Sequence, residues 1–236
     1  ALFLWTYLIK QKKRDIYLFA VGCGDSFTPL NKYLIARSLK RVKGVFVRDE
    51  ASQIKLQTEF NVLSEVIPDV AYAYPVSNLD IIEKKLYVIV GIVDYDVFKR
   101  YTGEVEAETV SKKKYMQLWL DKILDHGFDN ILLLATTYTD LVMSKQLYKY
   151  IQNKPVNIKV EFVDKLLSLE EYCNHLSKAE KIFSGRMHSL ILGERFGCQP
   201  CAWPISKKIL AYEAEQEKRV SINNVKKNLT NTIKDI

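Results

Sequence analysis

The sequence predicts an α/β protein whose mostly parallel sheets are covered by helices. Short apolar runs alternate along the chain with amphipathic segments, which is the βαβ pattern of such folds. The chain has 236 residues, of which 48% are hydrophobic, so it can bury the core of one large domain or of two small ones. With only 9 Gly and 6 Pro in the chain, long disordered linkers are not expected.

The alternation places six strands and six helices in order along the chain. Apolar runs bounded by turn residues predict strands, whereas apolar residues that recur with a helical period predict helices. We expect the strands at residues 16–21, 44–47, 86–93, 131–136, 158–163 and 181–183. We expect the helices at residues 29–41, 51–60, 112–126, 141–152, 169–178 and 187–196.

The segment between residues 75 and 85 is the predicted domain boundary. Pro75-Val-Ser-Asn78 has the composition of a loop, and a new apolar strand follows it. We therefore expect residues 1–80 to be the C-terminal part of a first domain with too few strands to stand alone. We expect residues 85–210 to form a complete second domain, and residues 211–236 to form a helical tail. Because the chain starts inside an apolar segment, we also expect native sequence to be missing upstream.

The net charge of +7 favours acidic partners, such as phosphorylated metabolites, anionic lipid headgroups or nucleic acid. The basic residues are spread along the chain, and the densest cluster, Lys112–Lys114, opens a predicted helix. Zinc-finger spacing and an aromatic RNA-binding signature are both absent from the sequence, so nucleic acid is not an expected partner. A chain of this size with only four cysteines suits a reducing compartment, and we expect a cytoplasmic protein.

The strongest local signal is the segment Ser184-Gly-Arg-Met-His188. It places Arg186 and His188 where the carboxyl end of a strand meets the start of a helix, with Ser184 and Gly185 forming the turn. Ligands of open α/β sheets bind at that edge, and a helix N-terminus favours an anion. Arg186 can grip a carboxylate or phosphate with two hydrogen bonds, and His188 can exchange a proton near neutral pH. Alternatively, Arg186 pairs with a surface acid and His188 is an ordinary helix residue.

Arg48 and a lysine near residue 208 are further candidates for an anion site. Arg48 follows the strand at 44–47, and Asp49 suits the N-cap of the next helix. Arg48 therefore either faces a cleft or pairs with Asp49, Glu50 or Asp69. Lys208, or its neighbour Lys207, stands at a predicted helix start, where it can hold a phosphate as a point charge.

A zinc site is weighed and set aside. Cys198 and Cys201 have CxxC spacing, and Cys173 with His175 would be needed as further ligands. A second CxxC pair is missing, and residues i and i+2 of a helix do not face one another. We therefore expect neither a metal nor a cofactor.

Taken in order, these segments resemble the bacterial polysaccharide pyruvyl transferase family. The resemblance covers about residues 16–210, and Gly185-Arg-Met-His188 is its most diagnostic part. The opening Asn-x-Gly-Asp-type loop of the family is missing from this chain, and the spacing around Gly197–Pro200 carries an extra residue. The matching segments are Val21–Gly24, Val47–Ser52, Pro68–Ala71, Ser184–Ser189, Gly197–Pro200 and Ser206–Lys208.

This resemblance implies two Rossmann-like domains facing across a cleft, similar to GT-B glycosyltransferases, with the first domain incomplete in this chain. It implies transfer of a pyruvyl group, as a ketal, from phosphoenolpyruvate to a sugar of a bacterial surface polysaccharide, such as a capsule or exopolysaccharide, or of its precursor. His188 then falls on the catalytic position. Arg48, Arg186 and Lys208 fall on donor-binding positions, and the supporting positions are Asp49, Ser184, Gly185 and Lys207.

The implied acceptor is a sugar or a lipid-linked oligosaccharide, and the basic surface would suit peripheral contact with an anionic membrane at its inner face. Two other functions remain open at this point. A GT-B-like glycosyltransferase would use the same basic residues to hold the diphosphate of a nucleotide sugar. A degenerate member would bind a glycan without catalysis. The donor that the protein binds, phosphoenolpyruvate, a nucleotide sugar or neither, distinguishes these three functions.

Overall fold

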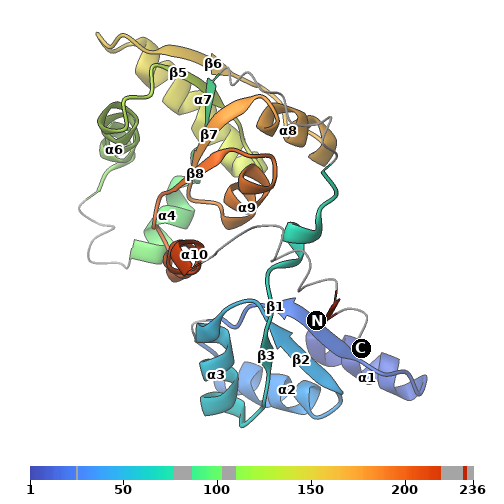
Figure 1. The fold of residues 1–236 in the computed structure, drawn as a ribbon. Coiled ribbons are helices and arrows are strands. Elements are labelled where there is room, and N and C mark those ends of the chain that lie inside the picture. The colour runs from blue at the N-terminus through green and yellow to red at the C-terminus, as the bar shows by residue number, and fades with distance from the viewer. Residues whose placement is uncertain (25, 77–86, 103–109, 219–230, 233–236) are drawn as a thin grey trace. The chain divides into compact units, whose positions relative to one another are not determined.

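The computed structural model describes residues 1–24, 26–76, 87–102, 110–218 and 231–232. The chain divides into two compact units, which are drawn in Figure 1. The first unit contains Ala1 to Ala73 together with the described residues 231–232 of the C-terminal segment, and the second runs from Tyr74 to Arg219. Each unit has its own parallel sheet, so each is treated as a fold in its own right.

The first unit is a three-stranded parallel sheet with helices. Its strands are β1 (Tyr17–Val21), β2 (Gly44–Val47) and β3 (Glu65–Val66), in the order β1-β2-β3. Its helices are α1 (Leu2–Gln11), α2 (Pro29–Leu39), α3 (Glu50–Phe60) and the 3-10 turn η1 (Val70–Ala73). Side chains of Thr28 and Asp49 cap α2 and α3, and the main core of the unit is formed by Leu39, Val45, Val47 and Leu56.

The second unit is a doubly wound parallel sheet of five strands, in the order β6-β5-β4-β7-β8. The strands are β4 (Tyr87–Gly91), β5 (Asn130–Leu133), β6 (Lys159–Phe162), β7 (Ala179–Ser184) and β8 (Gln199–Ala202). The helices are α4 (Tyr95–Thr102), α6 (Lys112–Asp125), α7 (Tyr138–Gln152), α8 (Leu169–Leu176), α9 (Met187–Arg195) and α10 (Lys207–Lys218). Because the winding reverses between β4 and β7, the carboxyl ends of these two strands form the topological switch point where such folds bind ligands.

Both faces of the five-stranded sheet are covered by helices (Figure 1). Helices α6 and α7 pack on the face that carries Val88, Val90 and Phe183, with the buried Trp119 at the centre of this core. On the other face, α9 lies so close to β7 that Gly193 touches Ile182. Burial on both faces explains why the central strands read as continuous apolar runs instead of alternating ones.

All twelve predicted elements are present, with ends that differ by at most three residues where the structure describes them. Among the other described elements, α1, α4, β3, β8 and η1 were not predicted, and α10 was expected only as a helix start near Lys207 and Lys208. β3 consists of two residues, both exposed, and the sequence of β8 is Gln-Pro-Cys-Ala. Neither strand therefore forms an apolar run that the sequence could reveal. None of the helices in the described ranges is long and apolar enough to cross a membrane.

The predicted domain limits fall near the observed division without coinciding with it. The units separate between Ala73 and Tyr74, just before the predicted boundary segment, most of which (77–85) lies outside the described residues. Helix α10 runs across position 210, where the second domain was expected to end. The expected helical tail beyond Lys218 lies outside the described residues except for 231–232.

Candidate functional site

The centre of the site is the pair of strand ends at the switch point. Gly91 at the end of β4 lies beside Ser184 at the end of β7. The Ser184 hydroxyl donates to the Gly91 carbonyl (3.0 Å) and accepts from the Arg186 N–H (3.1 Å). A Cβ on Gly91 would stand 2.8 Å from this hydroxyl. Ser184, predicted as a supporting residue, therefore fixes the backbone that delivers Arg186.

Gly185 makes room for the turn. A Cβ on Gly185 would lie 2.9 Å from Val93 Cγ2 and 3.1 Å from Ile205 Cδ1. The same packing brings in the chain after β8, because the Trp203 N–H donates to the Ser184 carbonyl at 3.0 Å. The predicted supporting role of Gly185 thus has a steric reason: only glycine lets these three segments meet.

Arg186 is the N-cap residue of α9 and is held by Asp140. Its Nε donates to Asp140 Oδ2 (3.0 Å) and its Nη2 to Asp140 Oδ1 (2.7 Å). The Asp140 side chain is 1% exposed, whereas that of Arg186 is 29% exposed. The alternative in which Arg186 pairs with an acid is therefore present in the geometry, but the acid is buried and the arginine still reaches the surface.

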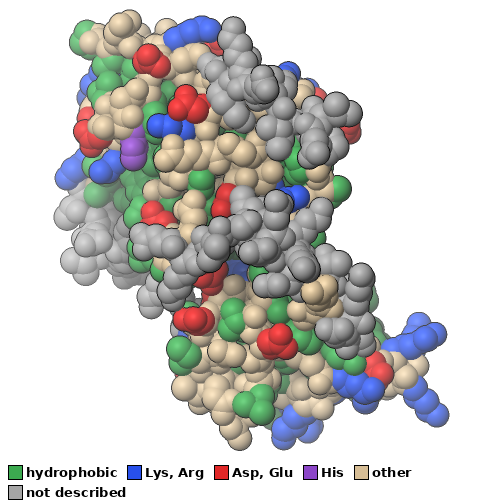
Figure 2. Space-filling model, viewed as in Figure 1, with side chains coloured by type: hydrophobic (Ala, Val, Ile, Leu, Met, Phe, Trp, Pro, Cys, Tyr) green, Lys and Arg blue, Asp and Glu red, His purple; other side chains and the backbone are tan. Residues whose placement is uncertain are grey.

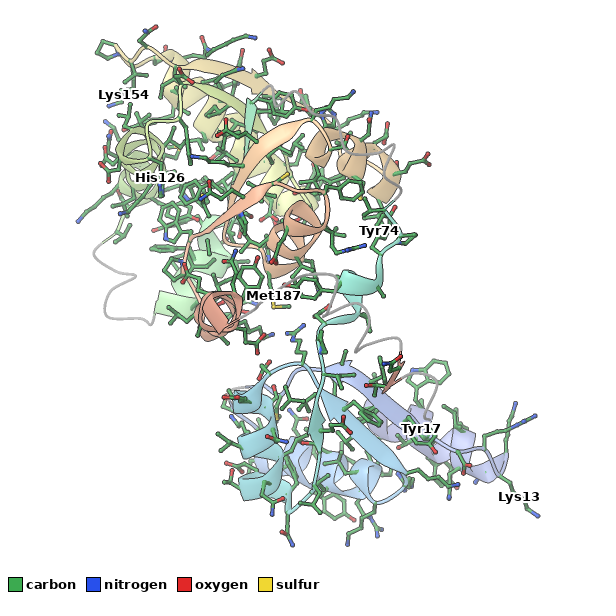
Figure 3. The ribbon with its side chains drawn as sticks, viewed as in Figure 1. Lys13, Tyr17, Tyr74, His126, Lys154 and Met187 are labelled. Atoms are coloured by element: carbon green, nitrogen blue, oxygen red, sulfur yellow. The ribbon has the colours of Figure 1, made fainter. Side chains whose placement is uncertain are left out.

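Two features of this junction leave it open to an anion. Nη1 of Arg186 has no hydrogen-bond partner among the described residues. No side chain caps the N-terminus of α9, whose first N–H groups have no acceptor within the helix. Figure 3 labels Met187 at the first position of this helix. His188 lies in the same first turn and is exposed, so it is accessible for proton exchange.

The beginning of α10 is brought to the same junction. The segment before it packs against the turn through Ile205, which touches Gly185, and α10 then starts at Lys207. The side chain of Lys208 is exposed, whereas that of Lys207 lies outside the described part of the structure. Both predicted lysines therefore belong to the helix that follows this contact.

Arg48 occupies the equivalent place in the first unit. It follows β2, its N–H donates to the Val21 carbonyl (3.2 Å), and its side chain is 15% exposed. Nη1 donates to Asp69 Oδ2 at 3.2 Å, and Nε lies 3.7 Å from Asp49 Oδ2. Of the three acids that were open as partners, Asp69 is the hydrogen-bonded one, and Asp49 mainly caps α3 by accepting from the Ser52 N–H (2.7 Å).

The two arginines are presented in the same way within their own units. Each follows a parallel strand, and each is bonded to an aspartate that follows another strand of the same sheet. The open alternative in which each arginine pairs with an acid therefore describes the geometry, because Asp69 and Asp140 lie at hydrogen-bond distance from Arg48 and Arg186. Asp140 itself was not predicted. Its signal is Thr136-Thr-Tyr-Thr-Asp140, a polar stretch directly after an apolar strand.

Two other groups near these strand ends, Tyr115 and Cys23, are poor acid–base groups. Burial raises the pKa of Tyr115, whose hydroxyl donates to the Val93 carbonyl (2.8 Å). Burial also raises the pKa of the Cys23 thiol, which lies at the end of β1 and so remains a thiol at neutral pH. An apolar cavity of about 260 Å³ behind Gly22 and Cys23 offers few polar partners for a charged ligand. His188 is an exposed imidazole in the first turn of α9, two residues after Arg186.

The residues that were weighed as zinc ligands and set aside have other contacts in the described part of the structure. Cys198 donates its thiol to the Leu176 carbonyl (3.0 Å), and Tyr87 contacts His175 Nδ1 (3.1 Å). Across the described ranges, His, Cys, Asp and Glu form no group of three that could bind a metal ion.

Comparison with known proteins connects this arrangement to a family. The family model for polysaccharide pyruvyl transferase matches residues 2–202. A search of curated protein sequences gave no significant match. Among solved structures, one named as a UDP-N-acetylglucosamine 2-epimerase from Listeria monocytogenes superposes with a TM-score of 0.52 at 10% identity.

This likeness covers 95% of the present chain and 65% of the epimerase chain. At such low identity it shows the fold alone, and it confirms the predicted α/β class with Rossmann-like, GT-B-like architecture.

Proposed function

Because the match over residues 2–202 shows that the chain belongs to the polysaccharide pyruvyl transferase family, we propose that it transfers a pyruvyl group from phosphoenolpyruvate to a sugar. Membership of the family makes it a transferase of polysaccharide biosynthesis. We propose phosphoenolpyruvate as the donor, a ketal as the product and a bacterial surface polysaccharide as the acceptor.

The observation that supports the donor is the open anion site at the start of α9. Phosphoenolpyruvate carries a carboxylate and a phosphate, about three negative charges at neutral pH because the second phosphate pKa is near 6. Arg186 has one donor edge without a partner in the described residues, directly before an uncapped helix N-terminus. Oriented N–H groups and the helix dipole favour an anion at that place.

The paired aspartates decide how the donor charge is met. Since Asp140 and Asp69 offset the arginine charges, Arg186 and Arg48 serve mainly as directional hydrogen-bond donors. Lys208, exposed near the start of α10, adds a point charge, which suits a phosphate. The N-terminus of α9 supplies the rest of the attraction.

The proposed reaction uses His188 for proton transfer. The methylene carbon of phosphoenolpyruvate gains a proton and becomes the methyl group, while one sugar hydroxyl loses a proton and bonds to the adjacent carbon. The second hydroxyl then bonds to that carbon, inorganic phosphate leaves with the remaining proton, and the cyclic ketal is complete. His188 delivers or removes one of these protons as a general acid–base group, and the cations of the site stabilise the departing phosphate.

Isothermal calorimetry with phosphoenolpyruvate and, separately, with nucleotide sugars tests this proposal. We expect wild type to bind phosphoenolpyruvate and Arg186→Lys to bind it at least tenfold more weakly, because lysine cannot bond Asp140 through a two-bond fork and still present a fixed donor to the ligand. Product analysis with a diol acceptor should show release of phosphate together with the ketal. Absence of phosphoenolpyruvate binding by the wild-type protein would refute the proposal.

A nucleotide-sugar donor is the second candidate, because the uncapped N-terminus of α9 beside Arg186 also suits a diphosphate. Binding of a nucleotide sugar alone would establish this candidate. Binding of neither donor would indicate the degenerate, glycan-binding alternative.

We further propose a lipid-linked acceptor handled in the cytoplasm, with peripheral contact of the basic protein with the anionic inner leaflet. The net charge of +7 and the four free cysteines support this location. Sedimentation with anionic and with neutral vesicles tests the membrane contact, since only the anionic ones should retain the protein at low salt.

A further inference from the structure

Asp140 is the most heavily bonded carboxylate at the Arg186 junction. It accepts from Arg186 Nε and Nη2 (3.0 and 2.7 Å), from the Asp94 N–H (2.8 Å) and from the Thr136 hydroxyl (3.3 Å). These donors follow three different strands, β7, β4 and β5. One buried side chain thus ties together the carboxyl ends of the three adjacent central strands.

Asp140 is built into its place from the α7 side as well. Thr137 caps α7 by accepting from the Asp140 N–H (3.2 Å), so Asp140 stands in the first turn of that helix. The helix dipole favours a negative charge there. A carboxylate that is 1% exposed is costly to bury unless its hydrogen bonds are satisfied, and here each oxygen accepts two hydrogen bonds.

The geometry of the pair determines which edge of Arg186 is left over. Asp140 takes the side of the guanidinium formed by Nε and Nη2, and this fork holds the planar group in one orientation. The edge that contains Nη1 has no partner among the described residues. Since the Arg186 side chain is 29% exposed, a ligand can approach it on that edge.

We propose that Asp140 is a positioning residue for the donor: it holds Arg186 side-on so that Nη1 meets the donor anion. This inference rests on the proposed function and adds to it a residue that never touches the substrate. Pre-orientation of this kind removes the entropy cost of ordering a long arginine when the donor binds.

A double-mutant cycle tests whether Asp140 acts through Arg186. Asp140→Asn keeps the size of the side chain but loses its charge and one acceptor. We expect KM for phosphoenolpyruvate to rise about tenfold, as for loss of an orienting partner, with a smaller change in kcat. Arg186→Lys should raise KM similarly, and the double variant should be no worse than Arg186→Lys alone. If the increase in KM of the double variant were the product of the two single increases, the residues would act independently and the proposal would be overturned.

Thr136→Val is the matched control, because it removes one bond to Asp140 and leaves the Arg186 contacts in place. Its KM for phosphoenolpyruvate should stay within about twofold of wild type. Asp140→Glu, which restores the charge, should recover part of the loss caused by Asp140→Asn. A control as impaired as Asp140→Asn would mean that the network merely maintains the fold.

A measurement on wild type needs neither a variant nor turnover. The Arg186 Nε–H, bonded to Asp140, should give a slowly exchanging ¹⁵N NMR signal that persists when phosphoenolpyruvate is added, while the Nη signals change. Loss of the Nε–H signal on addition of the donor would show that the donor displaces Asp140 and would overturn the positioning role. A persistent Nε–H signal without any binding of phosphoenolpyruvate would instead refute the proposed function and, with it, this inference.

Discussion

The Arg186 guanidinium and the Asp140 carboxylate meet through two hydrogen bonds of 3.0 and 2.7 Å, although 46 residues separate them in the sequence. Arg186 follows β7 and Asp140 opens the helix after β5, so the pair passes over the end of β4, which lies between these strands. The contact therefore exists only because the sheet order reverses at β4 and β7. Figure 2 shows acidic and basic side chains scattered among apolar and polar ones on the visible face of the second unit.

Substitution of Gly22 should disturb Arg48 without unfolding the first unit. A Cβ on Gly22 would stand 2.9 Å from Arg48 Nε and Nη2, and the far end of a flexible side chain can move away. We expect Gly22→Ala to weaken phosphoenolpyruvate binding about tenfold, as for a displaced orienting group, while Tm falls by only a few degrees. Gly24→Ala is the control, because its Cβ would meet only the Phe27 ring at 3.6 Å. If both variants bound phosphoenolpyruvate equally well, Arg48 would not be a donor-binding residue.

His188→Gln should strongly lower kcat and leave the fold intact. The side chain is exposed, and substitutions at such positions usually change stability by less than about 0.5 kcal/mol. Removal of a general acid–base group lowers kcat by about 10²- to 10⁴-fold, whereas donor binding should change little. Steady-state kinetics beside calorimetry checks this prediction. A variant that retains near-wild-type kcat would remove His188 from the mechanism.

Gly193→Ala should destabilise the second unit by overpacking. The new Cβ would overlap Ile182 Cγ2, and overpacking of a well-packed core costs about 1–3 kcal/mol. Because α9 carries Arg186 and His188 at its start, a displaced helix should also raise KM for the donor. Ile182→Ala makes space at this contact, so the double variant Gly193→Ala/Ile182→Ala should be less destabilised than the sum of the single changes. Denaturation with urea gives the four free energies, and simple additivity would contradict the contact.

Stability should fall at acidic pH because of His175. Burial lowers the pKa of His175 below its ordinary value of 6.5, so the unfolded chain binds a proton that the folded protein resists. The free energy of unfolding should therefore decrease as pH falls through 6.5 toward the lower pKa of the folded state. Burial raises the pKa of its neighbour Tyr87 to about 12, so that hydroxyl stays protonated throughout.

The change His175→Gln removes this titration, so the variant should lose less stability than wild type between about pH 7.5 and pH 5.5. Urea denaturation at a series of pH values measures the difference. Two curves that run parallel would show that His175 takes no part. His126 and His188 are present in both proteins and cancel in the comparison.

Local sequence was sufficient for the twelve predicted elements and for the position of the Ser184–His188 segment at the junction of β7 and α9. The Ser184-Gly-Arg-Met segment predicts strand, turn and helix in that order, since turn formation and the helix start depend on neighbouring residues. It thereby placed Arg186 and His188 at a strand end. Asp49 was predicted as a cap for the same reason, and it does cap α3.

Elements without a local signal could not be predicted. β3 and β8 exist because they pair with β2 and β7, and their own residues are exposed or polar. The same holds for ion pairs. The sequence offered Asp49, Glu50 and Asp69 as possible partners of Arg48. The pairing of β2 with β3 brings Asp69 to hydrogen-bond distance.

The sequence by itself determined the α/β class, the order of most elements, and the arrival of an arginine and a histidine at one strand end, because these depend on short-range propensity and periodicity. Only the tertiary structure decided that Nε and Nη2 of Arg186 are already bonded to Asp140. That fact required β5, β4 and β7 to lie side by side, so that a carboxylate 46 residues away could be buried against the guanidinium. The pairing is a property of strand order, which no local pattern encodes.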